Sequence, residues 1–106
     1  MIVVTSETIA NKRIVKTLGL VRGNTVRARH IGKDIMAGLR NIVGGEVHEY
    51  AKLIAESREQ TLDRMVTEAE ELGANAIIAA RFTTSVMMGG AAELLAVGTG
   101  VIVEDA

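Results

Sequence analysis

The stretch from Glu46 to Leu72 constrains the fold more than any other part of this sequence, because its apolar residues recur at helical spacing. These residues are Val47, Tyr50, Ala51, Ile54, Leu62, Met65, Val66, Ala69 and Leu72. Their steps of three and four draw one apolar stripe, and charged side chains such as Glu59 and Asp63 occupy the opposite side. At 1.5 Å per residue the helix would be about 40 Å long. Gly73 stands where a left-handed C-terminal cap is favoured, so the predicted helix ends there.

Segments rich in β-branched residues precede this helix and predict two strands. Residues 2–4 predict a short strand, and Asn11–Lys12 is typical of a turn. Residues 13–28 predict a longer strand that is interrupted at Gly19 and Gly23, where the glycines mark a bulge or a turn. The centre of this strand is apolar on both alternating faces, which indicates a strand that is buried on both sides.

Two further strands are predicted after the helix, at residues 76–86 and 94–103. A reversal at Gly89–Gly90 would join them as a hairpin. Gly98 and Gly100 are two residues apart, so they share one face of the last strand. Because side chains are missing there, we expect close packing by the long helix or by a neighbouring backbone.

Residues 31–43 predict a second, shorter helix that starts near Gly32 or Lys33 and stops at Gly44–Gly45. The order of elements is then ββ-αα-ββ within a single domain over residues 1–106. This order predicts an α+β fold with an antiparallel or mixed sheet and both helices packed on one face. The other face also carries apolar residues, and a partner chain would cover it.

The composition supports a partner chain. The hydrophobic share is 48%; counting the eleven glycines and leaving out the one tyrosine raises it to about 57%, against about 45–50% for an ordinary domain. Aromatic residues are nearly absent, so the excess is aliphatic. A chain of 106 residues has little interior in which to bury it. We therefore expect a homo-oligomer with apolar surface buried between subunits.

Several function classes are disfavoured by the sequence. The net charge of -1 creates no field that would attract nucleic acid or an anionic membrane, and we expect neither as a partner. The chain has no cysteine, which excludes disulfides, thiolate metal sites and cysteine nucleophiles. We recognise neither a signal peptide nor an apolar run near the roughly 20 residues of a membrane span, and expect a cytoplasmic protein. Neither a dinucleotide-binding loop nor a Gly-x-Ser-x-Gly elbow is present, and we expect no enzyme.

A heavy-metal site without cysteine would depend on imidazoles, carboxylates and thioethers. His30 and Asp34 are four residues apart, which is a usable ligand pair if that turn is helical. His48 is a weaker candidate, because the carboxylate next to it would diverge from it on a helix. The alternative is that both histidines are solvent-exposed surface residues. A site completed by several subunits stays open, because an oligomer multiplies each weak ligand.

Glu68, Glu70 and Glu71 lie in the last turn of the predicted long helix, where the helix dipole favours cations instead. This placement suggests a cationic partner, such as Lys12, Arg13, an arginine of a neighbouring subunit or a metal ion. The alternative is an ordinary solvated face.

A local basic run comprises Arg22, Arg27, Arg29, His30 and Lys33. Arginines next to backbone amides at a helix start could bind a phosphate or carboxylate ligand. The alternative is that these arginines pair with the glutamates across a subunit interface.

The sequence resembles the YbjQ-like family over nearly its whole length. The matching segments are residues 19–23 (GLVRG), 33–35 (KDI), 40–45 (RNIVGG), 68–69 (EA), 72–76 (LGANA) and 98–101 (GTGV). The resemblance implies a small α+β subunit similar to dodecin that assembles as a ring, commonly a pentamer. The family label proposes heavy-metal binding but implies no particular ligand residues.

Three hypotheses follow. The first is a ring-forming subunit that binds a small ligand or a divalent metal ion through surfaces shared between copies. The second is a structural or interaction protein with no ligand of its own. The third is an enzyme whose site is completed between subunits.

Overall fold

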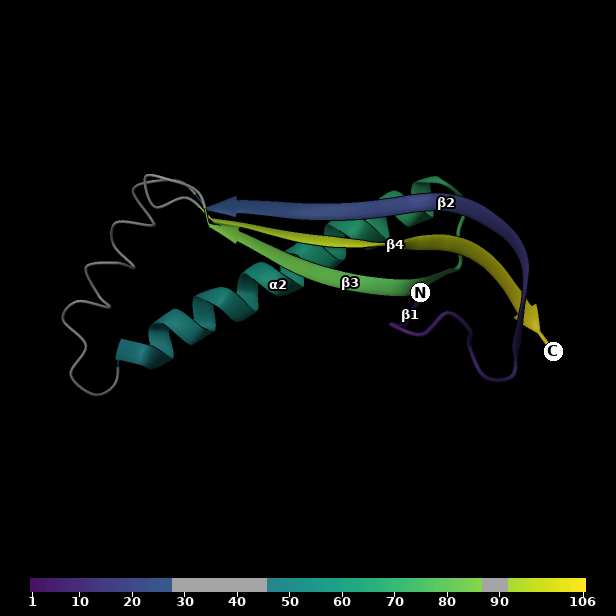
Figure 1. The fold of residues 1–106 in the computed structure, drawn as a ribbon, viewed down its shortest axis with the longest axis horizontal. Coiled ribbons are helices and arrows are strands. Elements are labelled where there is room, and N and C mark those ends of the chain that lie inside the picture. Colours follow the sequence, from purple (N-terminus) through teal and green to yellow (C-terminus); the bar gives the residue numbers. More distant parts are fainter. Residues whose placement is uncertain (28–45, 87–91) are drawn as a thin grey trace.

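The computed structural model describes residues 1–27, 46–86 and 92–106, which form a four-stranded sheet with a long helix on one face (Figure 1). The elements are β1 (Ile2–Val3), β2 (Lys12–Arg27), α2 (Glu46–Glu71), β3 (Ala76–Val86) and β4 (Ala92–Asp105). The strand order is β1-β3-β4-β2. β4 pairs antiparallel with both β2 and β3, whereas β1 pairs parallel with β3. The predicted α+β class with a mixed sheet is therefore confirmed.

Helix α2 has nearly the bounds that its apolar stripe predicts. Met65 and Ala69 of that stripe are fully buried, whereas Glu56 and Glu59 on the opposite side are exposed. The helix crosses diagonally behind the strands, and its N-terminal end projects beyond them (Figure 1). The C-terminal half of α2 therefore supplies most of the contact with the sheet.

The end of α2 is closed by the predicted glycine cap. Gly73 has φ 89°, and its N–H donates to the Glu70 carbonyl at 3.0 Å. The Ala74 N–H reaches back to the Ala69 carbonyl, also at 3.0 Å. These two bonds form a Schellman motif, and both alanines are buried in the main core cluster. The cap therefore turns the chain directly into β3.

Strand β2 is continuous over 16 residues, so the predicted interruption at Gly23 is wrong. Gly19 does mark a bulge, because the register shifts between Thr17 and Gly19 and its φ is 125°. Gly23 instead lies where α2 crosses β2. A Cβ atom there would lie 2.4 Å from the Met65 nitrogen and 2.5 Å from the Thr61 carbonyl oxygen. Because both are helix backbone atoms that cannot move aside, no larger residue fits.

Close packing at Gly98 and Gly100 is confirmed, but the helix does not cause it. A Cβ atom at Gly98 would lie 2.6 Å from the Ile77 side chain and 3.2 Å from the Ile78 carbonyl oxygen. At Gly100 it would lie 3.1 Å from the Val21 side chain. Neighbouring strands therefore make the approach, and the part of the prediction that named the long helix is wrong.

A second, smaller core lies on the face of the sheet away from α2. Gly23 faces α2 and pairs with Ala96, so by alternation Val101 and Val103 of β4 point to the opposite face. They are buried together with Ala76, and Ile9, Ile14 and Ile78 pack against them. The segment that follows β1 is fixed over this end by a bond from the Ala79 N–H to the Ser6 carbonyl at 2.8 Å. The chain thus covers one end of its helix-free face.

Several predictions lie outside the described residues: the short helix at 31–43, Gly44–Gly45 and the reversal at Gly89–Gly90. The pairing of Val86 with Ala92 is nevertheless that of a β3–β4 hairpin. In the described part of the chain, no helix is both long and apolar enough to cross a membrane.

Candidate functional site

A buried hydroxyl cluster fixes α2 on β2 next to the Gly23 crossing. Ser57, Thr61 and Thr25 are all at most 3% exposed. The Thr61 hydroxyl donates to the Ser57 carbonyl at 2.8 Å and lies 2.8 Å from the Thr25 hydroxyl. Because the Thr61 proton is used towards Ser57, Thr25 is the donor between the two hydroxyls. This network sets the position of the helix, and with it the groups that flank the edge of β2.

The helix-free face of the sheet has two halves that differ in cover. The covered half-face is the second core described above. The open half-face comprises Leu20, Arg22, Asn24 and Val26 of β2, Glu93, Leu95 and Val97 of β4, and Arg81, Thr83 and Ser85 of β3, which lie on one face by register. Leu20 is 64% exposed and Val26 51% exposed. Two aliphatic side chains on the same face of β2, with Arg22 and Asn24 between them, are therefore left in water, which indicates a surface for a partner.

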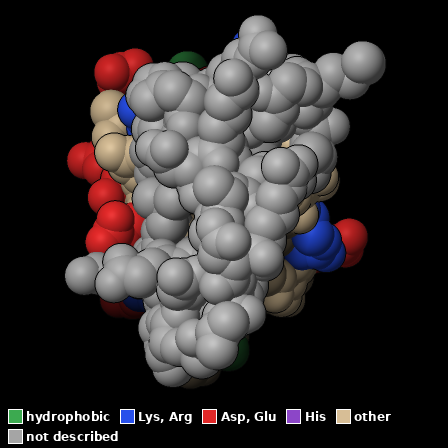
Figure 2. Space-filling model, turned by 90° about the vertical axis from the view of Figure 1, so that its left-hand side faces the viewer, with side chains coloured by type: hydrophobic (Ala, Val, Ile, Leu, Met, Phe, Trp, Pro, Cys, Tyr) green, Lys and Arg blue, Asp and Glu red, His purple; other side chains and the backbone are tan. Residues whose placement is uncertain are grey.

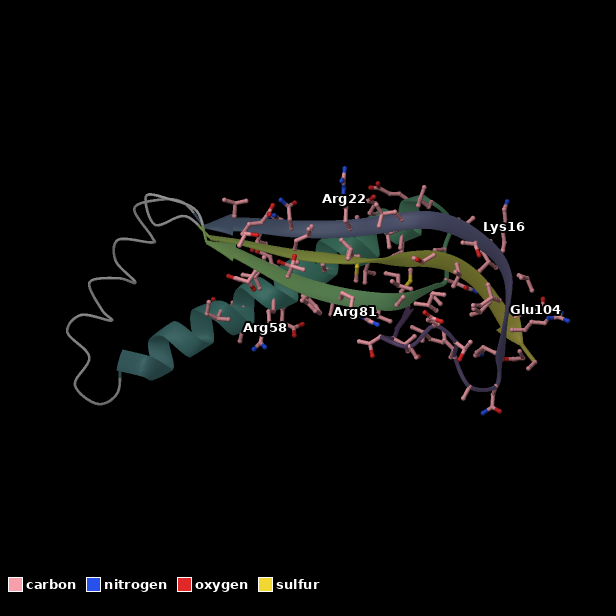
Figure 3. The ribbon with its side chains drawn as sticks, in the orientation of Figure 1. Lys16, Arg22, Arg58, Arg81 and Glu104 are labelled. Atoms are coloured by element: carbon pink, nitrogen blue, oxygen red, sulfur yellow. The ribbon has the colours of Figure 1, made fainter. Side chains whose placement is uncertain are left out.

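The charge on the open half-face is mainly positive. Arg22 and Arg81 lie on one row of the sheet, each directly opposite Val97. Arg81 is tied down, since its Nη1 donates to the Thr5 carbonyl at 2.7 Å. Arg22 points away from the sheet and makes neither a hydrogen bond nor an ion pair with any described residue (Figure 3). Among the described residues it is the free cation of this surface.

The acid of the open half-face is already engaged. The Asn24 side-chain amide donates to Glu93 Oε2 at 3.1 Å, so the Glu93 carboxylate is held by its neighbour on the next strand. The Glu93 carboxylate is therefore not directed at Arg22. The Arg22 guanidinium can bind an outside carboxylate or phosphate.

A polar flank of α2 runs beside the outer edge of β2. It comprises Gln60, Asp63, Arg64, Thr67, Glu68 and Glu71, which line a shallow hollow. Arg64 Nη1 donates to the Asn24 carbonyl at 2.6 Å and so ties this flank to the edge strand. Its three carboxylates have no ion-pair partner among the described residues. Figure 2 shows acidic side chains gathered along one side of the molecule, with the larger basic patch on the other.

The two cations considered as partners for the helix-end glutamates have other partners. Lys12 Nζ lies 2.5 Å from Asp105 Oδ1, and Arg13 pairs with Glu104, across the β2–β4 register. The hydrogen bond from Lys12, followed by its positive charge, lowers the pKa of Asp105 below 3.8. The prediction that Lys12 or Arg13 neutralises the end of α2 within one chain is therefore wrong.

The predicted metal ligands are not brought together by the described structure. His30 and Asp34 lie outside the described residues, and His48 lies in the part of α2 whose side chains are not described. Over residues 1–27, 46–86 and 92–106, no three of His, Cys, Asp and Glu lie close enough together to hold a metal ion. Metal binding therefore stays a prediction for these three residues.

Sequence reasoning missed the buried hydroxyls of α2 and the exposure of β2. The apolar stripe has a gap between Ile54 and Leu62, and Ser57 and Thr61 fill it with the same spacing. That gap was the available signal for a polar contact under the helix. Apolar residues on the second face of the sheet were expected, but the sequence did not show that Leu20 and Val26 are the ones left exposed, because that depends on the strand register.

Comparisons with known proteins cover the whole chain. A family model described as "Putative heavy-metal-binding" matches residues 1–104. A UPF0145 protein of Methanosarcina acetivorans is 56% identical over 101 residues, which is 95% of each chain. Another, of Dehalococcoides mccartyi strain 195, is 57% identical over 104 residues, which is 98% of this chain and all of the relative.

A solved structure has a similar fold at low sequence identity. It is a crystal structure of a protein of unknown function from the DUF74 family of Pediococcus pentosaceus, with a TM-score of 0.57 and 15% identity. The match covers 100% of this chain and 98% of that one, and it supports the fold alone. The family model and the relatives together show that the chain belongs to the YbjQ-like family.

Proposed function

We propose that this chain is a subunit of a homo-oligomeric ring in the cytoplasm and that it binds a metal ion or small ligand at surfaces shared between copies. The observation that carries the proposal is the open half-face, where Leu20 and Val26 are half or more exposed. Covering these side chains removes apolar surface from water, which stabilises the assembly by about 25 cal/mol per Å² of buried apolar area. A pentamer is the ring size that the family resemblance implies.

The ligand part of the proposal rests on the description of the family. Within one copy, no group of three potential ligands is present among the described residues. A metal site built from those residues alone would therefore need carboxylates from two copies. His30, Asp34 and His48 remain the candidate ligands from the rest of the chain.

Light scattering coupled to gel filtration tests the assembly. We expect a mass several times 11.3 kDa at micromolar concentration. Leu20→Asp should shift that mass toward the single chain, because a carboxylate in a dry interface is strongly disfavoured. A wild-type protein that elutes as a single 11.3 kDa species would refute the proposal.

Metal content and calorimetry with Cu, Zn and Ni test the ligand part. If imidazole binds the metal, the double variant His30→Ala and His48→Ala should lose binding while the mass of the assembly is unchanged. Unchanged affinity in that variant would remove the histidines from the site. The absence of binding by the wild type would favour the second candidate, an assembly protein with no ligand of its own.

We propose no catalytic role. The exposed carboxylates of α2 and the free Arg22 lie on a helix flank and a sheet face rather than around one enclosed pocket. An enzyme would need an acid or base and a convergent donor at one reacting atom. From the described residues, a site completed by a second copy would be needed to supply that arrangement.

A further inference from the structure

The open half-face and the polar flank of α2 carry opposite charges. On the open half-face Arg22 is exposed and has no partner in the part of the chain that the structure describes, while Glu93 is held by Asn24. On the polar flank three carboxylates, those of Asp63, Glu68 and Glu71, line the same hollow as Arg64. Because Arg64 is directed at the Asn24 carbonyl, its charge is only partly available to those carboxylates.

These two surfaces lie on different sides of the sheet, and no ion pair joins them within the described residues of one chain. Arg22 is on the helix-free side, since its neighbours Val21 and Gly23 face α2 and are buried. The polar flank belongs to the helix on the other side. Arg22 and the three carboxylates therefore remain available to pair with groups of a second copy.

The charges also select how two copies meet. If two open half-faces stacked on each other, Arg22 and Arg81 of one copy would face the same two arginines of the other. Like charges in a dehydrated contact are disfavoured. A polar flank facing an open half-face instead brings carboxylates to a free guanidinium, which is a charge-assisted contact.

We infer that the open half-face of one copy receives the polar flank of α2 from the next copy, with Arg22 directed at Asp63, Glu68 and Glu71. This inference rests on the proposed self-assembly and names its surfaces. Leu20 and Val26 supply the apolar part of the contact. Leu72, 47% exposed one turn beyond Glu68, is the apolar residue at the end of the flank.

The contact joins two different surfaces, so it is head-to-tail. A head-to-tail contact repeats around a closed ring when its rotation closes, and it leaves no copy with an unused surface. Because its polar part is ionic, the assembly should weaken as salt increases.

A charge exchange tests this arrangement. Arg22→Glu alone should raise the dissociation constant of the assembly at least about tenfold, because it sets a new carboxylate against the three of the polar flank. Glu68→Arg with Glu71→Arg should do the same, and arginines in the last turn of α2 agree with the helix dipole, so folding is retained. The triple variant that combines all three changes should restore assembly, measured by light scattering over a dilution series.

Two matched variants control for charge alone. Arg58→Glu reverses an exposed arginine on α2 that lies away from the β2 edge (Figure 3). Glu59→Arg with Glu70→Arg reverses two exposed glutamates outside the polar flank. Both controls should assemble like the wild type.

The outcomes separate this inference from the proposed function. If Leu20→Asp dissociates the assembly but Arg22→Glu does not, the self-assembly stands and the head-to-tail contact is wrong. If Arg22→Glu and the double variant Glu68→Arg with Glu71→Arg each dissociate the assembly, and the triple variant does not restore it, then the proposed pairing of Arg22 with the polar flank is wrong. A monomeric wild type would overturn both proposals.

Discussion

Two regions of β2 lie only a few residues apart but are packed in opposite ways. At Gly23 the strand lies against the backbone of α2, so closely that a single methyl group would overlap it. At Leu20 and Val26, on the other side of the same strand, aliphatic side chains stand in water. One side is packed to the limit within a single copy, and the other leaves Leu20 and Val26 half or more exposed.

This difference in packing shows which side of the sheet a single chain can cover by itself. The helix side has a closed core with satisfied hydroxyls, and no buried side-chain polar atom in the described residues lacks a partner. Within residues 1–27, 46–86 and 92–106, the helix-free side closes where the N-terminal segment covers Val101 and Val103. The chain therefore folds around α2 and leaves half of one face to something else.

Gly23→Ala should give the largest effect, because it breaks the packed side. The new Cβ would overlap helix backbone at 2.4 and 2.5 Å, so α2 must shift away from β2. Overpacking of this kind costs about 1–3 kcal/mol and here should reach about 3 kcal/mol or more of the free energy of unfolding. Urea denaturation measures it, and a loss below about 1 kcal/mol would show that the crossing is looser than described.

Val21→Ala and Val26→Ala form a matched pair on the two sides of the strand. Val21 is fully buried, and its truncation should cost about 2 kcal/mol, toward the low end for large-to-small core substitutions. Val26 is 51% exposed, and its truncation should cost less than about 0.5 kcal/mol in the isolated chain.

The same pair of variants also tests whether a second copy covers Val26. If a second copy covers Val26, the cost of Val26→Ala should grow as protein concentration increases, since association stabilises the folded state by mass action. Denaturation at two concentrations a hundredfold apart measures this. If both variants lost the same free energy of unfolding at both concentrations, the two sides of β2 would not differ in packing.

Thr61→Val should cost about 1–2 kcal/mol, because it removes a buried hydroxyl that both accepts from Thr25 and donates to the Ser57 carbonyl. Thr67→Val is the matched control. The Thr67 hydroxyl makes the same bond to the carbonyl four residues earlier, at 2.9 Å to Asp63, but on the exposed side of α2. Its loss should change the free energy of unfolding by less than about 0.5 kcal/mol. Equal effects in urea denaturation would mean that the bond within the helix, and not burial, matters.

The long helix and all four strands were predictable because their signals are local. The apolar stripe of α2, the glycine cap at Gly73 and the β-branched runs each depend on neighbouring residues alone. The role of Gly23 was not predictable, because a glycine in a strand is equally consistent with a bulge, a turn or a close approach. Only the crossing by α2, at residues about 40 positions later in the sequence, decides between these three possibilities.

The candidate site was less predictable than the fold, for a related reason. The acidic end of α2 was identified as needing a cation, yet the sequence could not show that Lys12 and Arg13 have carboxylates opposite them in β4. The side of the sheet on which Arg22 lies depends on the bulge at Gly19, because one extra residue exchanges the two faces of everything that follows. Charged residues can be read directly from a sequence, whereas the residues that face them are known only once the strand register is known.

Asp105 should give the smallest effect, at the end of the sheet remote from both regions. Its pKa is lowered in the folded chain by Lys12, so folding is favoured while the carboxylate is ionised. This contribution is complete above the unfolded pKa, near 3.8, and is lost as pH falls through the lower folded pKa. Asp105→Asn should therefore reduce the difference in urea midpoint between pH 7 and pH 2.5 by a small amount, while Glu59→Gln, whose carboxylate has no ion-pair partner among the described residues, should leave it unchanged. A larger difference in the Asp105 variant would contradict the sign of this linkage. Because the pair is exposed, added salt should diminish its effect, whereas the losses at Gly23 and Val21 should persist, since they come from packing and not from charge.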